Sequence, residues 1–238
     1  MGKSKFMIIS KKRGASVNFS VRMNGIKMDM CDSYKYLGVY FDKNLNWESH
    51  VKYVCKKVSN ACGSLAKLRN CLDLETLREV YHALIHSYLR YGLIVWGTAT
   101  ETTLKPIQVL VNRAVRIMCS APLGRMDVNP LYENLEILKL NEIYDLETGK
   151  FMYKKNNDLL PVTIASYLEC VNPPQHRYNL RNRVQGAAPP VVHRLAIGER
   201  SVQVRGPNLW RDIPEYIKCS ESANSFKRLF KTHILSNN

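Results

Sequence analysis

The hydrophobic period of the chain changes at Trp47, and this change constrains the fold more than any other feature of the sequence. From there to Leu68, apolar residues recur every three or four positions, which is the spacing of one face of an α-helix. These residues are Trp47, Val51, Val54, Val58, Cys62, Leu65 and Leu68. The opposite face carries lysines and small polar residues, namely Ser49, Lys52, Lys56, Ser59, Asn60, Gly63 and Lys67. The sequence therefore predicts a long amphipathic helix over residues 47–70 that packs on one side only.

Two further helices are predicted downstream. Asp73 is a residue type that caps helices, and the apolar side of the helix after it is predicted to hold Leu77, Val80, Tyr81, Leu84 and Tyr88. A third helix is predicted over residues 103–119, with Arg113 and Arg116 on its polar side. Three helices of this length with short connections are typical of a compact bundle.

The first 45 residues indicate strands. Residues 5–10 form a short apolar run, and residues 17–23 alternate between apolar and polar side chains. Asn24-Gly25 follows, a pair that favours a type I′ hairpin turn because both positions accept a positive φ, and residues 26–30 are predicted to be the returning strand. A third run covers residues 34–41. We therefore expect a mainly α protein of the α+β class with one small N-terminal antiparallel sheet.

The C-terminal part is less regular. Pro122-Leu-Gly124 indicates a boundary, and helices are predicted over residues 140–155, 161–171 and 225–235. Residues 172–211 are expected to form a basic linker, since they are rich in Pro, Asn, Gln and Arg. The predicted domains are a β region (1–45), a helical bundle (46–124) and a C-terminal region (125–238).

The net charge of +15 indicates a phosphate-bearing partner, either nucleic acid or an acidic membrane surface. The most apolar stretch, residues 83–96, is interrupted by His86 and Arg90 and is too short to span a bilayer, so we expect no membrane protein. The seven cysteines are scattered and form no C-x-x-C pair. This usage favours a reducing compartment, the nucleus or the cytoplasm, and argues against a zinc or redox motif.

No complete catalytic motif is visible. Two-metal polymerases need clustered carboxylates, but none of the eight aspartates is adjacent to another or lies in a D-x-D or Y-x-D-D setting. His82 and His86 have the i, i+4 spacing of a metal-binding pair, without H-E-x-x-H or an identifiable third ligand. We therefore expect no metal site, and a solvated polar stripe on the second helix instead.

Two basic features are candidate nucleic-acid contacts. Lys52, Lys56 and Lys67 stand among short side chains, which allow a phosphate backbone to approach closely; a merely solvated helix face is the alternative. The second feature is the arginine-rich stretch that includes Arg177, Arg181 and Arg183, which is equally compatible with a flexible basic arm.

Tyr36-Leu-Gly-Val-Tyr-Phe-Asp42 is followed by Leu45-Asn-Trp47, Glu48 and His50-Val51. This series resembles the end of the palm and the region after it in jockey-like non-LTR retrotransposon reverse transcriptases. Further matches follow in the same order, at Tyr81 to Tyr91, Gly92, Val95-Trp-Gly97, Gln108, Asn112-Arg-Ala-Val-Arg-Ile117, Pro130-Leu131, Phe151-Met-Tyr-Lys154, Leu160-Pro161, Gly206-Pro-Asn-Leu-Trp210, Ile213-Pro214 and Ser225-Phe-Lys227.

This resemblance implies roles for particular residues. Tyr36, Leu37 and Gly38 match the hairpin that steadies the primer end, and the helix from Trp47 matches the first thumb helix, which lies along the template–primer duplex. Arg113 and Arg116, with the lysines of the first helix, are then nucleic-acid contacts. The partners that the resemblance implies are RNA, DNA or their hybrid, together with the fingers and palm of an intact enzyme.

The resemblance also implies that the catalytic part lies outside these residues. Lys3-Ser4 matches the palm segment just after the catalytic aspartates, so the fingers, most of the palm and the Mg²⁺ ligands of the family enzyme are expected upstream of Met1. We expect a nucleic-acid-binding fragment without its own catalysis or cofactor. The alternative is a truncated transposon remnant without a selected activity.

Overall fold

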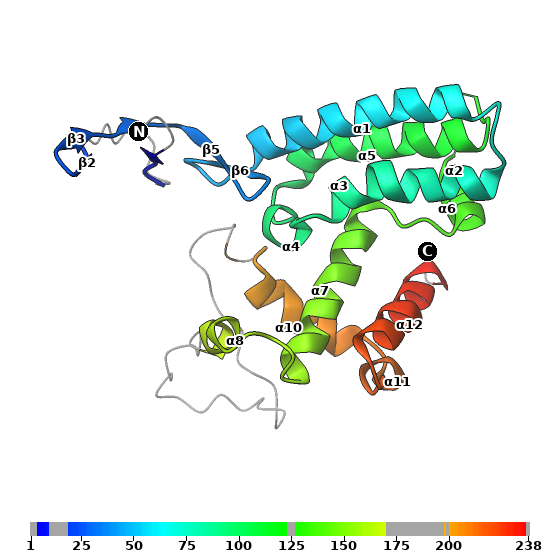
Figure 1. Cartoon of the computed structure of the whole chain (residues 1–238). Coiled ribbons are helices and arrows are strands. Elements are labelled where there is room, and N and C mark those ends of the chain that lie inside the picture. Colours follow the sequence, from blue (N-terminus) through cyan, green and yellow to red (C-terminus); the bar gives the residue numbers. More distant parts are fainter. Residues whose placement is uncertain (1–3, 10–18, 123–126, 170–197, 199, 237–238) are drawn as a thin grey trace. The chain divides into compact units, whose positions relative to one another are not determined.

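The structure, a computed structural model, describes residues 4–9, 19–122, 127–169, 198 and 200–236 (Figure 1). By its contacts the chain forms two compact units. Unit 1 consists of Met1–Gly92 and Ala99–Leu131, and unit 2 of Leu93–Thr98 and Tyr132–Asn238. The division into two compact units does not test which segments fold independently. The predicted domains therefore stay a prediction, with bounds at residues 1–45, 46–124 and 125–238.

The strands of unit 1 form three separate pairs. Their bounds are β1 Lys5–Phe6, β2 Arg22–Met23, β3 Ile26–Lys27, β4 Asp29–Met30, β5 Ser33–Tyr36 and β6 Val39–Asp42. The pairs β2–β3 and β5–β6 are antiparallel, whereas β1 pairs with β4 in parallel, with Lys5 opposite Asp29. The strands are mostly antiparallel, as expected, but they form three pairs and not one sheet, and one pair is parallel. The segment between β1 and β4 is long enough to bring the chain back in the same direction, which a parallel pair requires.

Two tight turns close the antiparallel pairs. Asn24 and Gly25 have φ of 50° and 78°, which confirms the predicted hairpin turn. The predicted third strand over residues 34–41 is wrong, because the chain reverses at Leu37 and Gly38, with φ of 46° and 85°. The alternating pattern continues through this turn, and Leu is an unusual residue in the left-handed region, so the reversal is not visible in the sequence.

The helices of unit 1 form the predicted bundle. They are α1 Glu48–Leu68, α2 Leu74–Tyr81, the π-turn η1 His82–His86, α3 Ser87–Arg90 and α5 Glu101–Met118. In Figure 1, α1 and α5 lie side by side, with the α2–α3 rod against them. The side chain of Asp73 accepts a hydrogen bond from the Thr76 amide (2.7 Å), which confirms the predicted cap of α2. The mainly α fold class is confirmed.

The π-turn corrects the predicted core of the second helix. Leu77 and Tyr81 are buried as expected, but Leu84 is exposed and Tyr88 only half-buried. Ile85 and Leu89, one residue further along in each case, are fully buried instead. A π-turn adds one residue to the helical repeat, and this addition shifts the inward-facing positions after Tyr81 by one.

Unit 2 is built around one long helix. Its helices are α4 Leu93–Trp96, α7 Leu140–Asn156, α8 Val162–Glu169, α10 Val202–Asp212, α11 Glu215–Lys218 and α12 Ala223–Ser236, while α6 Asn129–Leu135 crosses the division between the units. The helices α4, α10 and α12 all pack on α7. The predicted helices over residues 140–155, 161–171 and 225–235 correspond to α7, α8 and α12.

Of the predicted linker over residues 172–211, residues 172–197 and 199 lie outside the described residues, and the last part is wrong because it is the helix α10. Gly206 and Pro207 oppose a helix locally. Tertiary packing overrides them: Gly206 is buried against Met152 of α7, so closely that a Cβ on Gly206 would lie 2.7 Å from the Met152 sulfur. No helix within the described residues is long and apolar enough to cross a membrane.

Candidate nucleic-acid interface

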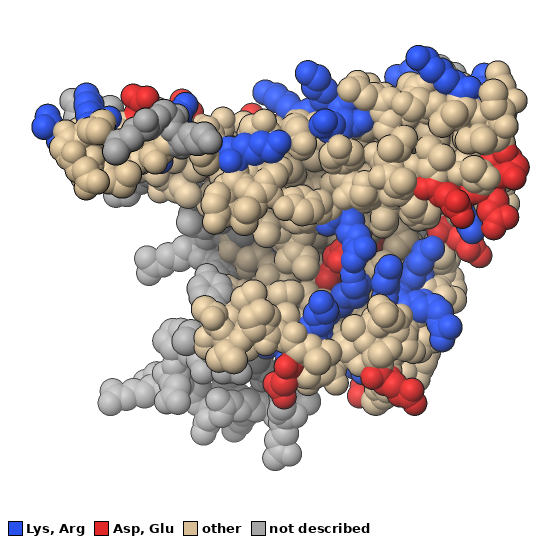
Figure 2. Space-filling view, viewed as in Figure 1, with Lys and Arg blue, Asp and Glu red and all other residues tan. Residues whose placement is uncertain are grey.

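The predicted lysine face of α1 is present and open. Lys52, Lys56 and Lys67 are exposed, whereas Val51, Val54, Val58, Cys62 and Leu65 on the other side are buried. At 100° per residue the three lysines lie within about 60° of one another, and they extend over about 22 Å along the helix. We call Lys52, Lys56 and Lys67 the lysine stripe. Figure 2 shows lysine and arginine side chains along the outer surface of α1.

The charge of the lysine stripe is not neutralised within the described part of unit 1. Glu48 is the single acidic residue of α1, against four lysines. None of the three stripe lysines forms an ion pair with a described residue. The side chains around the stripe are short, since Ser59, Asn60 and Gly63 are exposed between Lys56 and Lys67. An extended polyanion can therefore reach the lysines without steric interference.

The two predicted arginines of α5 differ in exposure. Arg113 is exposed. Burial raises the pKa of the Cys62 thiol of α1, and the positive charge of Arg113 lowers this pKa to a smaller degree. This interaction shows that Arg113 lies near α1. Arg116 is half-buried, and its Nε atom is enclosed by protein. Arg113 thus extends the basic surface beside α1, whereas Arg116 is less accessible. The predicted contacts Arg177, Arg181 and Arg183 lie outside the described residues.

The predicted primer-grip-like residues form the tip of the β5–β6 hairpin. Tyr36 and Leu37 are 61% and 73% exposed. Tyr91 directly follows α3, and its hydroxyl donates a hydrogen bond of 2.6 Å to the carbonyl oxygen of Leu37. Gly38 lies under the Tyr91 ring, and a Cβ at this position would approach the ring to 3.1 Å. The bundle therefore holds the hairpin tip in place while its apolar side chains remain exposed.

A buried carboxylate, to which the sequence analysis assigned no structural role, connects the hairpin to α1. Asp42 is 8% exposed and accepts hydrogen bonds from the amides of Asn44 and Asn46 (3.2 and 3.0 Å). Its second oxygen accepts one from the amide of Trp47 (2.8 Å), at the N-terminus of α1. Charge-assisted bonds of this kind are the stronger ones in proteins. They fix the direction in which α1 leaves the hairpin.

Sequence reasoning also missed an aromatic cluster at the start of α1. The rings of Tyr40 and Tyr53 have centroids 5.3 Å apart, and the buried His50 lies 6.1 Å from Tyr53. The ammonium groups of Lys35 and Lys57 lie 4.6 and 5.8 Å from the centroid of the Tyr53 ring. These residues come from two strands and a helix, and no local pattern brings them together.

His50 is held in its neutral form. Burial, and to a smaller degree the charge of Lys35, lowers the pKa of His50 to about 4. Its Nδ1 atom accepts a hydrogen bond from the amide of Tyr40 (3.3 Å), so the neutral ring carries its proton on Nε2. The positive charge beside the cluster therefore comes from the lysines and not from the histidine.

The His82–His86 pair does not extend into a larger cluster. The two rings are 5.1 Å apart on the same helix, as their spacing predicts. Within the described ranges, no group of three or more His, Cys, Asp or Glu side chains is placed to hold a metal ion.

Comparison with curated proteins identifies relatives of the kind that the sequence predicts. The chain is 30% identical over 109 residues to the probable RNA-directed DNA polymerase from transposon BS of Drosophila melanogaster, a match that covers 44% of this chain and 12% of the relative. It is 26% identical over 159 residues to the RNA-directed DNA polymerase from mobile element jockey of the same species, covering 62% and 17%. The chain is similar to non-LTR retrotransposon RNA-directed DNA polymerases. This confirms the resemblance predicted from the sequence.

A third polymerase relative comes from another insect. The chain is 29% identical over 119 residues to the retrovirus-related Pol polyprotein from type-1 retrotransposable element R1 4 of Nasonia vitripennis, which covers 45% of this chain and 30% of the relative. The chain thus spans less than a third of the length of each of these polymerase relatives. No family model matches the chain, and no solved structure matches it.

Proposed function

We propose that this chain binds nucleic acid, with a preference for RNA–DNA hybrid, along the lysine stripe of α1, as the thumb of a polymerase grips its template–primer. The observation that carries the proposal is the stripe itself, three exposed lysines on one helix face that form no ion pair with a described residue. Unneutralised lysines along a regular helix suit a phosphate backbone, which releases counterions when it binds them.

The activity for which the relatives are named supports this choice of partner. They are RNA-directed DNA polymerases, which use an RNA template and make DNA. We propose that the chain corresponds to the end of the palm, the thumb and the region after them in such a polymerase. In this assignment Tyr36, Leu37 and Gly38 are the primer-grip-like tip, and Arg113 adds a contact beside the stripe.

The proposal assigns no polymerisation to these 238 residues by themselves. The two-metal reaction needs clustered carboxylates, and the eight aspartates of the sequence are neither adjacent nor in alternate positions. Mg²⁺ is therefore assigned to the intact family enzyme and not to this chain. We further propose a reducing compartment, nuclear or cytoplasmic, because the cysteines are scattered and the six in the described ranges are free thiols.

Fluorescence anisotropy across a range of salt concentrations tests the proposal, with an RNA–DNA hybrid, single-stranded RNA and duplex DNA as ligands. The test variant combines Lys52→Gln, Lys56→Gln and Lys67→Gln. The control variant combines Lys105→Gln, Lys154→Gln and Lys227→Gln, which removes the same charge from α5, α7 and α12.

Each lost phosphate contact reduces the slope of log K against log salt by about 0.9 and, near 0.1 M salt, the affinity by close to a factor of ten. We expect the stripe variant to bind the hybrid about 500-fold more weakly near 0.1 M salt, with a slope shallower by about 2.7. Equal losses in the stripe and control variants, or equal affinity for all three ligands, would show that binding reports net charge alone. The transposon-remnant alternative would then be preferred.

A further inference from the structure

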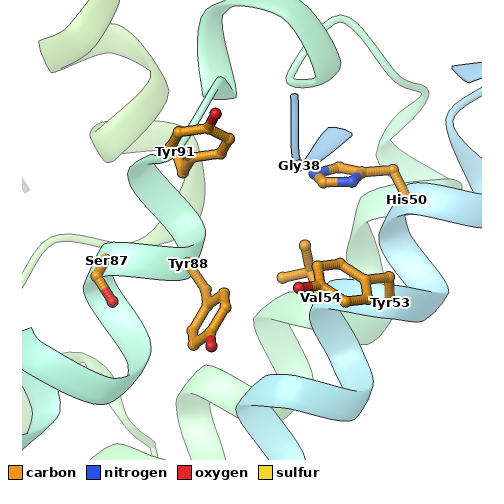
Figure 3. Close-up of a pocket in the computed structure, with 7 residues that line it drawn as sticks. All are labelled: Gly38, His50, Tyr53, Val54, Ser87, Tyr88 and Tyr91. Atoms are coloured by element: carbon orange, nitrogen blue, oxygen red, sulfur yellow. The ribbon is translucent and has the colours of Figure 1, made fainter. Parts of the chain in front are cut away.

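A cavity of about 300 Å³ lies in unit 1, between the β5–β6 hairpin, the start of α1 and α3. It is lined by Gly38 of the hairpin turn, His50, Tyr53 and Val54 of α1, Ser87 and Tyr88 of α3, and Tyr91. Figure 3 shows Tyr88 and Tyr91 on one side of the cavity and His50 and Tyr53 on the other. We propose that this cavity binds one unpaired nucleobase of the bound nucleic acid. The inference rests on the proposed function.

The size and walls of the cavity favour a single flat ring system. Small-molecule sites typically have volumes of about 300–1,000 Å³, so this cavity has room for one nucleoside and not for a longer segment. Its walls present three tyrosines and the backbone of Gly38. Aromatic side chains bind bases by stacking, and every base has a π-face, so such a site needs no particular sequence.

The charges beside the cavity match a nucleotide better than an apolar ligand. The Lys57 ammonium group lies 5.8 Å from the ring centroids of both Tyr53 and Tyr88, two of the lining residues. Lys35 approaches Tyr53 from the hairpin, at 4.6 Å. Neither lysine forms an ion pair with a described residue. A base between the rings would place its phosphate within reach of these ammonium groups.

The cavity is available only to a base that is not stacked in a duplex. A paired base presents its edges in the grooves and hides its faces, whereas an unpaired base at an end or a bulge exposes both. Lys52, the first lysine of the stripe, and three lining residues all lie at the start of α1, but His50 and Val54 are about 200° and Tyr53 about 100° around the helix from Lys52. An unpaired nucleotide that extends beyond a duplex on the stripe therefore reaches the cavity around the start of α1.

The cavity is held open by its surroundings. The hydrogen bond from Tyr91 to Leu37 ties the hairpin tip to the end of α3, and the Tyr40 amide holds His50. Both contacts join the hairpin to the helices that form the other walls. A site with fixed walls loses little conformational entropy when a ligand enters it.

The test compares two RNA–DNA hybrids that differ only in one unpaired 3′ nucleotide, which carries a base in the first and is abasic in the second. Both present the same phosphates, so the ratio of their dissociation constants isolates the base. For the full chain we expect at least about fivefold tighter binding with the base present, the factor that corresponds to the lower end of base–aromatic stacking, about 1 kcal/mol.

Three variants locate the effect. Tyr88→Leu removes a stacking surface and is expected to bring the ratio to about one, while Tyr88→Phe keeps the ring and is expected to retain the ratio. Ser87→Leu fills part of the cavity from an exposed position and is expected to lower the ratio without loss of the fold. Circular dichroism and thermal melting establish that each variant is folded.

The outcomes separate this inference from the proposed function. A ratio of one in the unmodified chain, or a ratio that Tyr88→Leu and Ser87→Leu leave unchanged, overturns the nucleobase site. If the hybrid then still binds through the lysine stripe, the proposed function stands without it. The proposed function is contradicted as well if the chain binds neither hybrid. It is also contradicted if the stripe variant binds the two hybrids as tightly as the unmodified chain does.

Discussion

The helices α1 and α7 are the longest elements of their units, and they use their surfaces in opposite ways. The buried residues of α1 lie on one face, and the lysine stripe occupies the other. The buried residues of α7 lie all round the helix, because α4, α10 and α12 pack against it. Other elements therefore cover α1 on one side and α7 on all sides.

The charges of the two helices follow the same division. On α7, Asp145 pairs with Arg205 of α10 (2.6 Å), and Glu147 pairs with Lys150 (2.9 Å). On α1, the lysines of the stripe have no such partners among the described residues. Charges that are paired inside a unit stabilise its fold, whereas unpaired charges in a row remain available for a ligand. The charges of α7 thus have a structural role, whereas the exposed face of α1 is the surface on which the proposed binding depends.

We expect the largest difference between the two helices in how acid changes the stability of their units, because His50 lies at the start of α1. Because the pKa of His50 in the folded chain is about 4 and its ordinary value is 6.5, the unfolded chain binds more protons between these values. Stability is therefore fully present above pH 6.5 and falls as the pH drops toward 4, by about 3 kcal/mol at most. No corresponding histidine lies on α7.

Single-tryptophan variants separate the two units in this acid titration. Trp47 reports on unit 1, and Trp96 or Trp210 on unit 2. We expect the urea midpoint from Trp47 to fall between pH 6.5 and 4.5, and the fall to be much smaller in His50→Asn, whose side-chain oxygen can still accept from Tyr40. A midpoint that falls equally in His50→Asn would mean that other groups cause the acid sensitivity.

Which face of α1 is buried could be predicted from the sequence, because it depends on the spacing of residues within the helix itself. Apolar residues at helical spacing fix which side is buried, and Asp73 indicates a cap by its type alone. The register after Tyr81 could not be predicted, because nothing in the sequence distinguishes the π-turn at residues 82–86 from an ordinary helical turn. The same holds for α10, where Gly206 and Pro207 locally oppose the helix that packing on Met152 stabilises.

The candidate site divides in the same way. The lysine stripe lies on one helix and follows from spacing, so the sequence predicts it. The cavity takes residues from the hairpin, α1 and α3, which come together only in the folded chain. Tyr36-Leu-Gly38 was associated with a hairpin only through the family resemblance, since the alternating pattern alone predicted a continuous strand.

Gly149 of α7 tests the wrapped helix. A Cβ at this position would lie 2.5 Å from the ring of Phe230 on α12. Phe230 is itself buried and stands next to Phe226, with ring centroids 5.5 Å apart, so it has little room to move. We expect Gly149→Ala to destabilise unit 2 by about 2 kcal/mol, although alanine is the better helix former. Urea unfolding followed by Trp210 fluorescence measures this change, and a stabilised variant would show that α12 does not cover α7 closely.

Gly63 of α1 is the matched glycine on the open helix, and the smallest effect is expected there. No atom lies within 4 Å of the position that a Cβ would take. Gly63→Ala therefore gains helix propensity without a clash, and we expect unit 1 to be stabilised by about 0.5–1 kcal/mol. The measurement is urea unfolding followed by Trp47 fluorescence, with Gly149→Ala as the opposite case. A destabilised Gly63→Ala would mean that the lysine face of α1 is covered in the folded chain, and the binding role assigned to it would then have to be abandoned.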